Sequence, residues 1–330
     1  MNKKINVALI YRECPSLSPN YFFTNLYNFF FKALKRNDQI DVTYFSGGKS
    51  FDATKLKGKF DVIVLPDNQN KTGDAAIPDQ IIGLDKIDIP VICKPGDFHD
   101  ALEFDPNFYH EKLKITAYFD MEHPDYFHKY YPKNFKFKTV FIGLEPSLFT
   151  NLTPFDKRIK NKILNSGNVG NSKLLSRLIT KLRKKGKNTN FDFYKLRTLC
   201  NLLPYVKYTS TLQHEFIGDK YPQLLQKYCA SIAASTTTPT RKYLEIPAAG
   251  CLTFMEVTEK NRGKYLQFKD DDNVIFINEK NYKKKFCEYL DDSENKKWEE
   301  IAKRGQYHAK NNLSNDKGVE LLVDLIKEII

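Results

Sequence analysis

Long apolar runs are absent from the sequence, and no stretch approaches the roughly 18 to 20 residues that a membrane-spanning helix requires. Cysteine is sparse, and the 6 cysteines show none of the short paired spacings typical of a zinc site. A secretory leader is also missing from the start of the chain. We therefore expect a cytoplasmic protein with reduced thiols that at most touches the inner face of a membrane.

Motifs for other ligand classes are missing too. The chain contains neither a dinucleotide fingerprint nor a P-loop, and it does not interleave Arg with aromatic residues as nucleic-acid binders do. The formal net charge of +12 favours an anionic partner, such as a nucleotide or an acidic lipid, although a general abundance of Lys and Asn also explains it. Asp270–Asp272 precedes a strand and is expected to be an exposed turn. We therefore expect no nucleic acid, no catalytic metal and no cofactor.

The length of 330 residues and a hydrophobic content of 41% predict two globular domains. Periodicity is lost between Gly143 and Asp156, which marks the expected hinge. The predicted domains are residues 1–150, residues 151–315, and a C-terminal helix, residues 316–330, that packs back on the first domain.

Apolar runs separated by helical connections predict a parallel, doubly wound α/β sheet in the first half. The expected strands are Ile5–Tyr11, Val42–Phe45, Asp61–Pro66, Pro90–Lys94, Lys114–Phe119 and Thr139–Ile142. A helix is expected over Tyr21–Lys35. Its many aromatic residues and its basic end permit two interpretations, packing in the core or contact with an anionic membrane.

Polar side chains follow two of these strands, where ligand sites of doubly wound sheets lie. Asp97, His99 and Asp100 come after one strand, and Glu122 and His123 come after another. A carboxylate beside an imidazole can orient a hydroxyl or pass a proton near neutral pH. Simple loop capping is the alternative for both groups.

The second half repeats the order of strand, loop and helix. Lys162–Asn165 is an expected strand, and the Gly-rich turn Gly167–Ser172 leads into a helix over Lys173–Lys184, an arrangement that lets a backbone approach a phosphate. The remaining expected elements are strands at Phe191–Tyr194, Tyr205–Tyr208 and Val274–Ile277, and helices at Lys220–Tyr228 and Asp316–Ile330.

The segment Ser231–Glu256 combines a strand, a Thr-rich turn and a helix. The helix is expected to start near Thr238 and Pro239 and to stop at Gly250. Its first turn carries Arg241 and Lys242, which suit a diphosphate, and Glu245 lies one turn further on, where it suits a ribose. An ordinary capped helix is the alternative.

Three segments resemble the GT-B class of glycosyltransferases, which has two Rossmann-like domains facing across a cleft. The branch related to bacterial spore-maturation glycosyltransferases, with a glycosyltransferase group 1 domain in its C-terminal half, is the most similar. The resemblance covers nearly the whole chain and is weak before Pro90. The segments are TVFIGLEPSLF (Thr139–Phe149), KILNSGNVGNSKLLSRL (Lys162–Leu178) and SIAASTTTPTRKYLEIPAAGCLTFME (Ser231–Glu256).

The resemblance implies a hexosyltransferase that uses a UDP- or GDP-linked sugar donor and a glycan, lipid-linked or protein acceptor. Glu245 would bind the ribose, and His99 would face the transferred sugar. The retaining relatives carry an acidic residue where this chain has Thr237, so the stereochemistry stays unassigned. The residues implied for the donor diphosphate are Gly167, Asn168 and Asn171 in the loop, and Thr236, Thr237, Thr238, Arg241 and Lys242 in the turn and helix.

The chemistry implied is displacement of a nucleoside diphosphate by an acceptor hydroxyl. Backbone N–H groups and Arg241 would stabilise the leaving group without a metal. An inverting reaction needs a general base, for which Asp97 and His99 are the candidates. The alternative function is a non-catalytic nucleotide- or sugar-binding protein with the same two domains.

Overall fold

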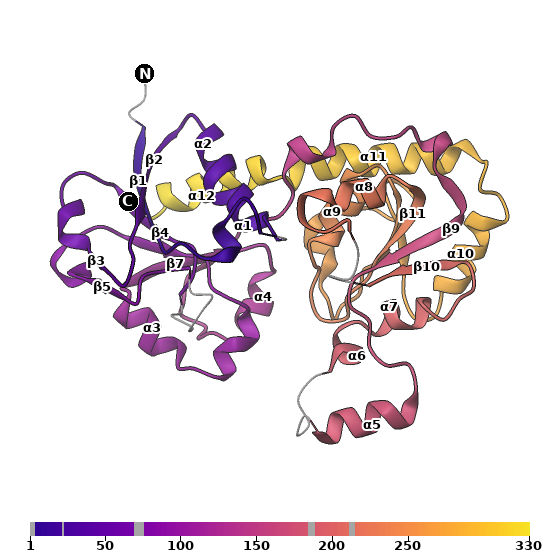
Figure 1. The fold of residues 1–330 in the computed structure, drawn as a ribbon, viewed down its shortest axis with the longest axis horizontal. Coiled ribbons are helices and arrows are strands. Elements are labelled where there is room, and N and C mark those ends of the chain that lie inside the picture. Colours follow the sequence, from indigo (N-terminus) through magenta and orange to yellow (C-terminus); the bar gives the residue numbers. More distant parts are fainter. Residues whose placement is uncertain (1–3, 22, 69–75, 184–188, 211–214) are drawn as a thin grey trace. The chain divides into compact units, whose positions relative to one another are not determined.

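The chain folds into two compact units, and the computed structural model describes residues 4–21, 23–68, 76–183, 189–210 and 215–330 (Figure 1). The first unit comprises Met1–Glu145 together with Ser314–Ile330, and the second comprises Pro146–Leu313. Each unit is built on its own parallel sheet, accompanied by helices. The structure therefore confirms the predicted class, α/β with two Rossmann-like domains.

The main sheet of the first unit has six strands in the order β2-β1-β4-β6-β7-β8, all parallel. Strands β4 and β6 are buried along their whole length, so their sequences read as continuous apolar runs and were readily predictable. A second, two-stranded sheet pairs β3 with β5. The strands are β1 (Ile5–Tyr11), β2 (Ile40–Ser46), β3 (Ser50–Asp52), β4 (Val62–Leu65), β5 (Gln80–Ile82), β6 (Val91–Cys93), β7 (Ile115–Asp120) and β8 (Phe137–Thr139).

The expected strand Thr139–Ile142 is wrong. Strand β8 ends at Thr139, and after a last hydrogen bond from Val140 N to Asp120 O (2.8 Å) the chain leaves the sheet. Val140 and Ile142 are buried in the core cluster that also contains apolar residues of the final helix, α12 (Asn315–Lys327). Alternating apolar residues indicate that a segment is buried, but they do not indicate whether a strand or a helix packs against it. This segment therefore has the sequence pattern of a strand.

Gly318 allows α12 to lie directly against the segment after β8. A Cβ atom at this position would stand 1.9 Å from the carbonyl oxygen of Phe141. We expect Gly318→Ala to lower the free energy of unfolding by about 1 to 3 kcal/mol, because one backbone must move away from the other. Urea unfolding measures the change. Gly48→Ala is the control, since a Cβ at Gly48 meets nothing within 4 Å. Equal stability of the two variants would contradict this packing.

The helix predicted for Tyr21–Lys35 begins later and is irregular. Phe22, part of that prediction, lies outside the described residues. The helix runs through α1 (Asn25–Tyr27), a π-helical segment (Asn28–Ala33) and α2 (Leu34–Arg36). The other α-helices of this unit besides α12 are α3 (Pro106–Lys112) and α4 (Pro124–Phe127).

The aromatic residues of this first helix pack inside the first unit. Phe29 and Phe30 are fully buried in the core. Phe31 stacks on Tyr27 and on Tyr44 of β2, with ring centroids 5.3 Å and 4.9 Å apart respectively. Core packing therefore accounts for the aromatic surplus, and no membrane contact is needed to explain it.

The sheet of the second unit has five parallel strands in the order β10-β9-β11-β12-β13. Its strands are β9 (Ile159–Ser166), β10 (Val206–Thr209), β11 (Tyr228–Ala233), β12 (Leu252–Glu256) and β13 (Ile275–Ile277). Its helices are α5 (Leu174–Arg183), α6 (Asn190–Phe193), α7 (Lys195–Cys200), α8 (Tyr221–Leu225), α9 (Lys242–Ala248), α10 (Tyr282–Leu290) and α11 (Lys296–Asn312).

Two predictions in this unit are wrong. The expected strand Phe191–Tyr194 is helix α6, which starts with a capping box in which Thr189 N donates to Asp192 Oδ2 (2.8 Å). The two reciprocal bonds satisfy backbone groups of the first turn and so favour a helix over an extended chain. The helix expected over Lys220–Tyr228 stops at Leu225, and Tyr228 begins β11.

Candidate functional site

Helix α9 starts later than the sequence predicts. It begins at Lys242 with Arg241 as its N-cap residue, and neither Thr238 nor Pro239 belongs to it. Its predicted end is confirmed. Gly250 has φ +70° and donates to Pro247 O (2.8 Å), the left-handed ending that glycine adopts without strain. The helix has seven residues, and the charged side chains of Arg241 and Lys242 stand at its start.

The Thr-rich turn before α9 divides into engaged and unengaged residues. Thr236 N donates to Phe193 O (2.8 Å), and Thr236 Oγ1 accepts from Lys195 N (3.2 Å), so this residue fastens the turn to α6 and α7. Thr237 is half-buried. The Oγ1 atoms of Thr238 and Thr240 are buried and have no hydrogen-bond partner among the described residues. Thr236 is thus the residue of the turn whose polar groups are shown to be used in packing.

Lys242 lies at the centre of the predicted site. Its ammonium group donates to Tyr221 OH (3.1 Å) and lies 3.4 Å from Ser166 Oγ, at the end of β9. Burial, followed by the positive charge of Arg197, lowers the pKa of Lys242 to about 7. Among the described residues, the hydrogen-bond partners of this amine are the two hydroxyls and no ion pair with a carboxylate is formed, so an anionic ligand would favour its charged form.

Glu245 is half-buried one turn along α9. Burial raises the pKa of its carboxyl, and the positive charges of Arg241 and Lys242 oppose this rise. Arg241, also half-buried, is the N-cap residue of the same helix. The helix therefore brings one carboxylate and two cations together, as the sequence predicts.

The Gly-rich loop lies against Lys242. Gly167 has φ +105°, and a Cβ atom there would stand 2.6 Å from Lys242 Cε. The positive φ favours glycine, and the missing side chain leaves room for the lysine. Because β9 and β11 are neighbours in the sheet, the loop after one and the turn after the other share its carboxyl edge, where such folds bind ligands. The structure thus brings together the two predicted donor-binding segments.

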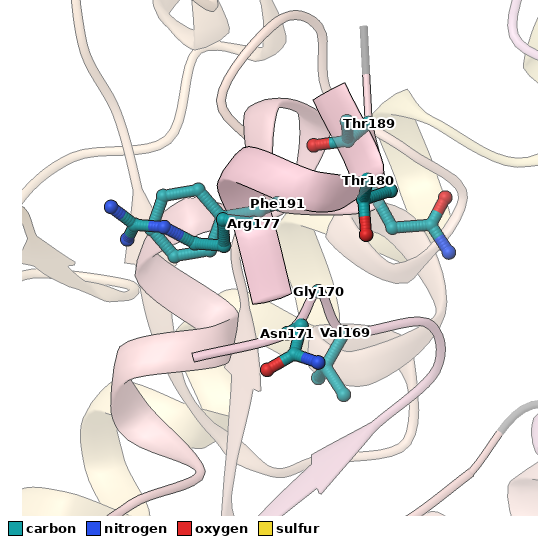
Figure 2. Close-up of a pocket in the computed structure, with 8 residues that line it drawn as sticks. Val169, Gly170, Asn171, Arg177, Thr180, Thr189 and Phe191 are labelled. Atoms are coloured by element: carbon teal, nitrogen blue, oxygen red, sulfur yellow. The ribbon is translucent and has the colours of Figure 1, made fainter. Parts of the chain in front are cut away.

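Asn168 and Asn171 lie differently within this loop. Both residues are exposed, but Asn168 O accepts a hydrogen bond from Arg197 (3.2 Å), whereas Asn171 Oδ1 accepts from Lys173 N (3.0 Å). Asn171 also lines a cavity of about 210 Å³ between the loop, α5 and α6 (Figure 2). Ligand pockets usually measure roughly 300 to 1,000 Å³, so this cavity is too small for a whole nucleotide sugar.

Arg197 is a buried residue of this site that sequence reasoning missed. It is 2% exposed, donates to Ala234 O (2.6 Å) and Asn168 O (3.2 Å), and stacks over the Tyr194 ring at 4.5 Å. Burial lowers its pKa. Arg197 thereby ties the Gly-rich loop to the end of β11 and adds positive charge. Because an arginine on a short helix usually points to solvent, nothing in the sequence indicates that Arg197 is buried.

In the first unit, Asp97 and His99 are exposed rather than buried. They flank Phe98, which packs into an aromatic cluster with Tyr126 and Phe127. The His99 side chain is 53% exposed, and its Nε2 lies 3.7 Å from Asp100 Oδ1. The turn is thus anchored by its phenylalanine, with both predicted catalytic side chains at the surface.

A buried charge cluster lies beside them, at the carboxyl ends of β6 and β7. Lys94 Nζ lies 2.9 Å from Asp120 Oδ2 and donates to Pro95 O (2.7 Å). Glu122 Oε2 is buried and has no hydrogen-bond partner in the part of the chain that the structure describes. We call Lys94, Asp120 and Glu122 the β6–β7 cluster.

Electrostatics single out Glu122 within the β6–β7 cluster. Burial, followed by the charge of Asp120, raises the pKa of Glu122 well above its ordinary value, and Lys94 opposes the rise. Burial alone would lower the pKa of Lys94, but Asp120 and Glu122 raise it, so the lysine stays charged. His123, the neighbour of Glu122, instead caps α4 by accepting from Asp125 N (3.1 Å).

No group of three or more His, Cys, Asp or Glu side chains that could hold a metal ion occurs among the described residues. Asp270 Oδ1 accepts from Phe276 N (2.6 Å). Asp271 pairs with Lys285, and Asp272 pairs with Arg304. The acidic run is therefore a largely exposed turn, as predicted, whose side chains are engaged by a backbone N–H and by two cations of the second unit. Within the described ranges, no helix is both long and apolar enough to span a membrane.

The comparisons with known proteins identify the fold. No family model and no curated protein matches the sequence. Among solved structures, the Anabaena protein Alr3699/HepE in complex with UDP and glucose is 12% identical, with 98% of this chain and 100% of that chain covered and a TM-score of 0.55. Sucrose-phosphate synthase from Thermosynechococcus elongatus is 9% identical, with 99% of each chain covered and a TM-score of 0.57. An alpha-glucosyltransferase in complex with UDP-glucose and DNA containing an abasic site is 12% identical, with coverage of 98% and 99% and a TM-score of 0.59. The chain thus has the GT-B fold of these glycosyltransferases.

Proposed function

We propose that this protein is a glycosyltransferase that moves a sugar from a nucleoside-diphosphate sugar to an acceptor hydroxyl. The observation that carries the proposal is the half-buried Lys242 beside Gly167, at the carboxyl edge of the second sheet. Structures with this fold bind UDP or UDP-glucose, which supports a UDP-linked donor over a GDP-linked one.

The donor diphosphate would bind between the Gly-rich loop and the start of α9. Lys242 and Arg241 would neutralise its charge directly, and the buried Arg197 would add to the positive potential behind the loop. Charge that is already in place stabilises a leaving diphosphate without reorganisation. We therefore propose a reaction independent of metal ions.

Glu245 would accept hydrogen bonds from the ribose hydroxyls. We expect Glu245→Ala to weaken UDP binding by roughly 10- to 100-fold, the range for a hydrogen bond to a charged group. Isothermal titration calorimetry measures the affinity. Glu259→Ala, which changes an exposed carboxylate of the same unit, is the control. Unchanged UDP affinity in Glu245→Ala would remove Glu245 from the site.

In the first unit, the β6–β7 cluster would receive the acceptor hydroxyl. The acceptor oxygen forms a bond to the anomeric carbon, the bond from that carbon to the diphosphate oxygen breaks, and its electron pair leaves with the diphosphate. Glu122 takes the acceptor proton. Its burial and unpartnered oxygen make it a better general base than the exposed His99 or Asp97.

A non-catalytic nucleotide- or sugar-binding protein is the alternative. The two functions differ in turnover, so the test is incubation of the full chain with UDP- and GDP-sugars and detection of released nucleoside diphosphate. Melting-temperature shifts with UDP and GDP establish binding separately, because a ligand of the native state raises apparent stability. Turnover with either donor supports the enzyme. Binding without turnover, with glycan, lipid and peptide acceptors present, would support the receptor.

A further inference from the structure

Helix α5 of the second unit turns its apolar side chains to solvent. Leu174, Leu175, Leu178, Ile179 and Leu182 are between 42% and 79% exposed, and none of the helix's residues is buried. They are five of the twelve large apolar side chains exposed in the described part of the chain, so a single ten-residue helix concentrates much of that surface. Contiguous apolar surface of this kind marks an interaction site.

The polar side of α5 faces the protein. Ser176, Arg177 and Thr180 are the half-buried residues of the helix. Arg177 stacks over the Phe191 ring at 4.0 Å, and Thr180 lines the small cavity beside α6 (Figure 2). A helix that packs on a core normally buries its apolar face. Here the orientation is reversed, so the apolar face is presented outward.

Cations flank this apolar face. At about 100° per residue, the five apolar side chains span an arc of about 140°, and Lys181 and Arg183 lie just outside it at opposite edges. The sequence of α5, LLSRLITKLR, contains no carboxylate. An apolar face bordered by cations is the pattern of helices that lie in the surface of an anionic bilayer.

We propose that α5 docks the protein on an anionic phospholipid bilayer, with its leucines among the upper acyl chains and Lys181 and Arg183 at the lipid phosphates. A second copy of the chain fits the same face less well. A symmetric pair would place α5 against α5 and bring cations together without an opposing carboxylate. This inference does not depend on the proposed function.

The test is co-sedimentation of the full chain with vesicles of phosphatidylcholine alone and of phosphatidylcholine mixed with phosphatidylglycerol. We expect binding to the mixed vesicles at low salt, and a reduction of at least about tenfold for the double variant Leu178→Glu/Leu182→Glu. Leu202→Glu is the matched control, because Leu202 is a 63% exposed leucine of the same unit outside α5. The melting temperatures of the double variant and of Leu202→Glu are measured to check that both proteins fold.

Two outcomes would overturn the proposal. One is that the wild type sediments equally with vesicles of phosphatidylcholine alone and with vesicles that also contain phosphatidylglycerol. The other is a dimer, detected by light scattering after size exclusion, that Leu178→Glu/Leu182→Glu converts to monomer, since the face would then bind a second copy. The variant Lys181→Gln/Arg183→Gln separates the charge contribution, and we expect it to weaken binding only to the anionic vesicles.

Discussion

Substitution of Glu122 by Gln is expected to lower kcat by about 10²- to 10⁴-fold, which is the contribution typical of a general base. Glutamine keeps the shape of the side chain and cannot accept the proton. The KM for the donor should change little, because the groups that would bind the donor lie in the second unit. The measurement is steady-state release of UDP. Glu111→Gln, which alters an exposed carboxyl of the same unit, is the control.

The pH dependence of this reaction provides a separate check. Burial and the charge of Asp120 raise the pKa of Glu122, with Lys94 opposing and Asp97 adding to the rise. Below that pKa the carboxyl is protonated and cannot act as a base, so kcat should rise with pH through it. The rising limb should be missing in Glu122→Gln. If Glu122→Gln keeps wild-type rates while His99→Gln loses them, the base is His99.

Substitution of Lys242 by Met is expected to weaken UDP binding by roughly 10²-fold at pH 6, within the range for removing one partner of a buried charge pair. Methionine retains the apolar stem that packs beside Gly167 and removes the charge. Isothermal titration calorimetry measures the affinity. Lys264→Met, which changes a 74% exposed lysine, is the control.

The effect should depend on pH in a defined direction. The pKa of Lys242 is lowered to about 7 in the free protein, so the ammonium is charged at pH 6 and largely neutral at pH 8. A bound diphosphate favours the charged form and raises this pKa. The contribution of Lys242 to binding is therefore complete below pH 7 and is lost as the pH rises, by up to about tenfold in affinity per pH unit.

The Lys242→Met variant isolates that contribution, because the nucleotide's own phosphate titrates equally in both proteins. The difference in binding free energy between wild type and variant should shrink from pH 6 towards pH 8.5. A constant difference across this range would show that Lys242 is not the group whose protonation is linked to binding.

Burial of a strand on both faces of the sheet explains which strands were predictable from sequence. Strands β1, β4 and β6 are apolar runs, and the left-handed ending of α9 follows from Gly250. The helix start at Thr238 and the strand at Phe191–Tyr194 failed for another reason. Thr236 is engaged by α6 and α7, and a capping box initiates α6, so contacts across the turn outweigh local preference.

The candidate site was predictable where its residues are adjacent in sequence. Arg241, Lys242 and Glu245 share one short helix, so their proximity is local. Glu122 was a candidate from sequence, but its grouping with Lys94 and Asp120 and the role of Arg197 were not predictable, because these contacts join side chains from separate elements. Asp97 and His99 have the right chemistry, and their exposure depends on Phe98 taking the buried position.

The amino-acid sequence by itself determined two parallel α/β units, the Gly-rich loop and the charged first turn of α9. Periodicity, glycine and charge act over a few residues and need no knowledge of distant parts of the chain. Only the tertiary structure decided that Gly167 lies beside Lys242, that Glu122 has a buried Oε2 atom whereas His99 is exposed, and that α5 turns its leucines outward. Burial and the pKa shifts that follow from it depend on which elements pack together, and that is a property of the whole fold.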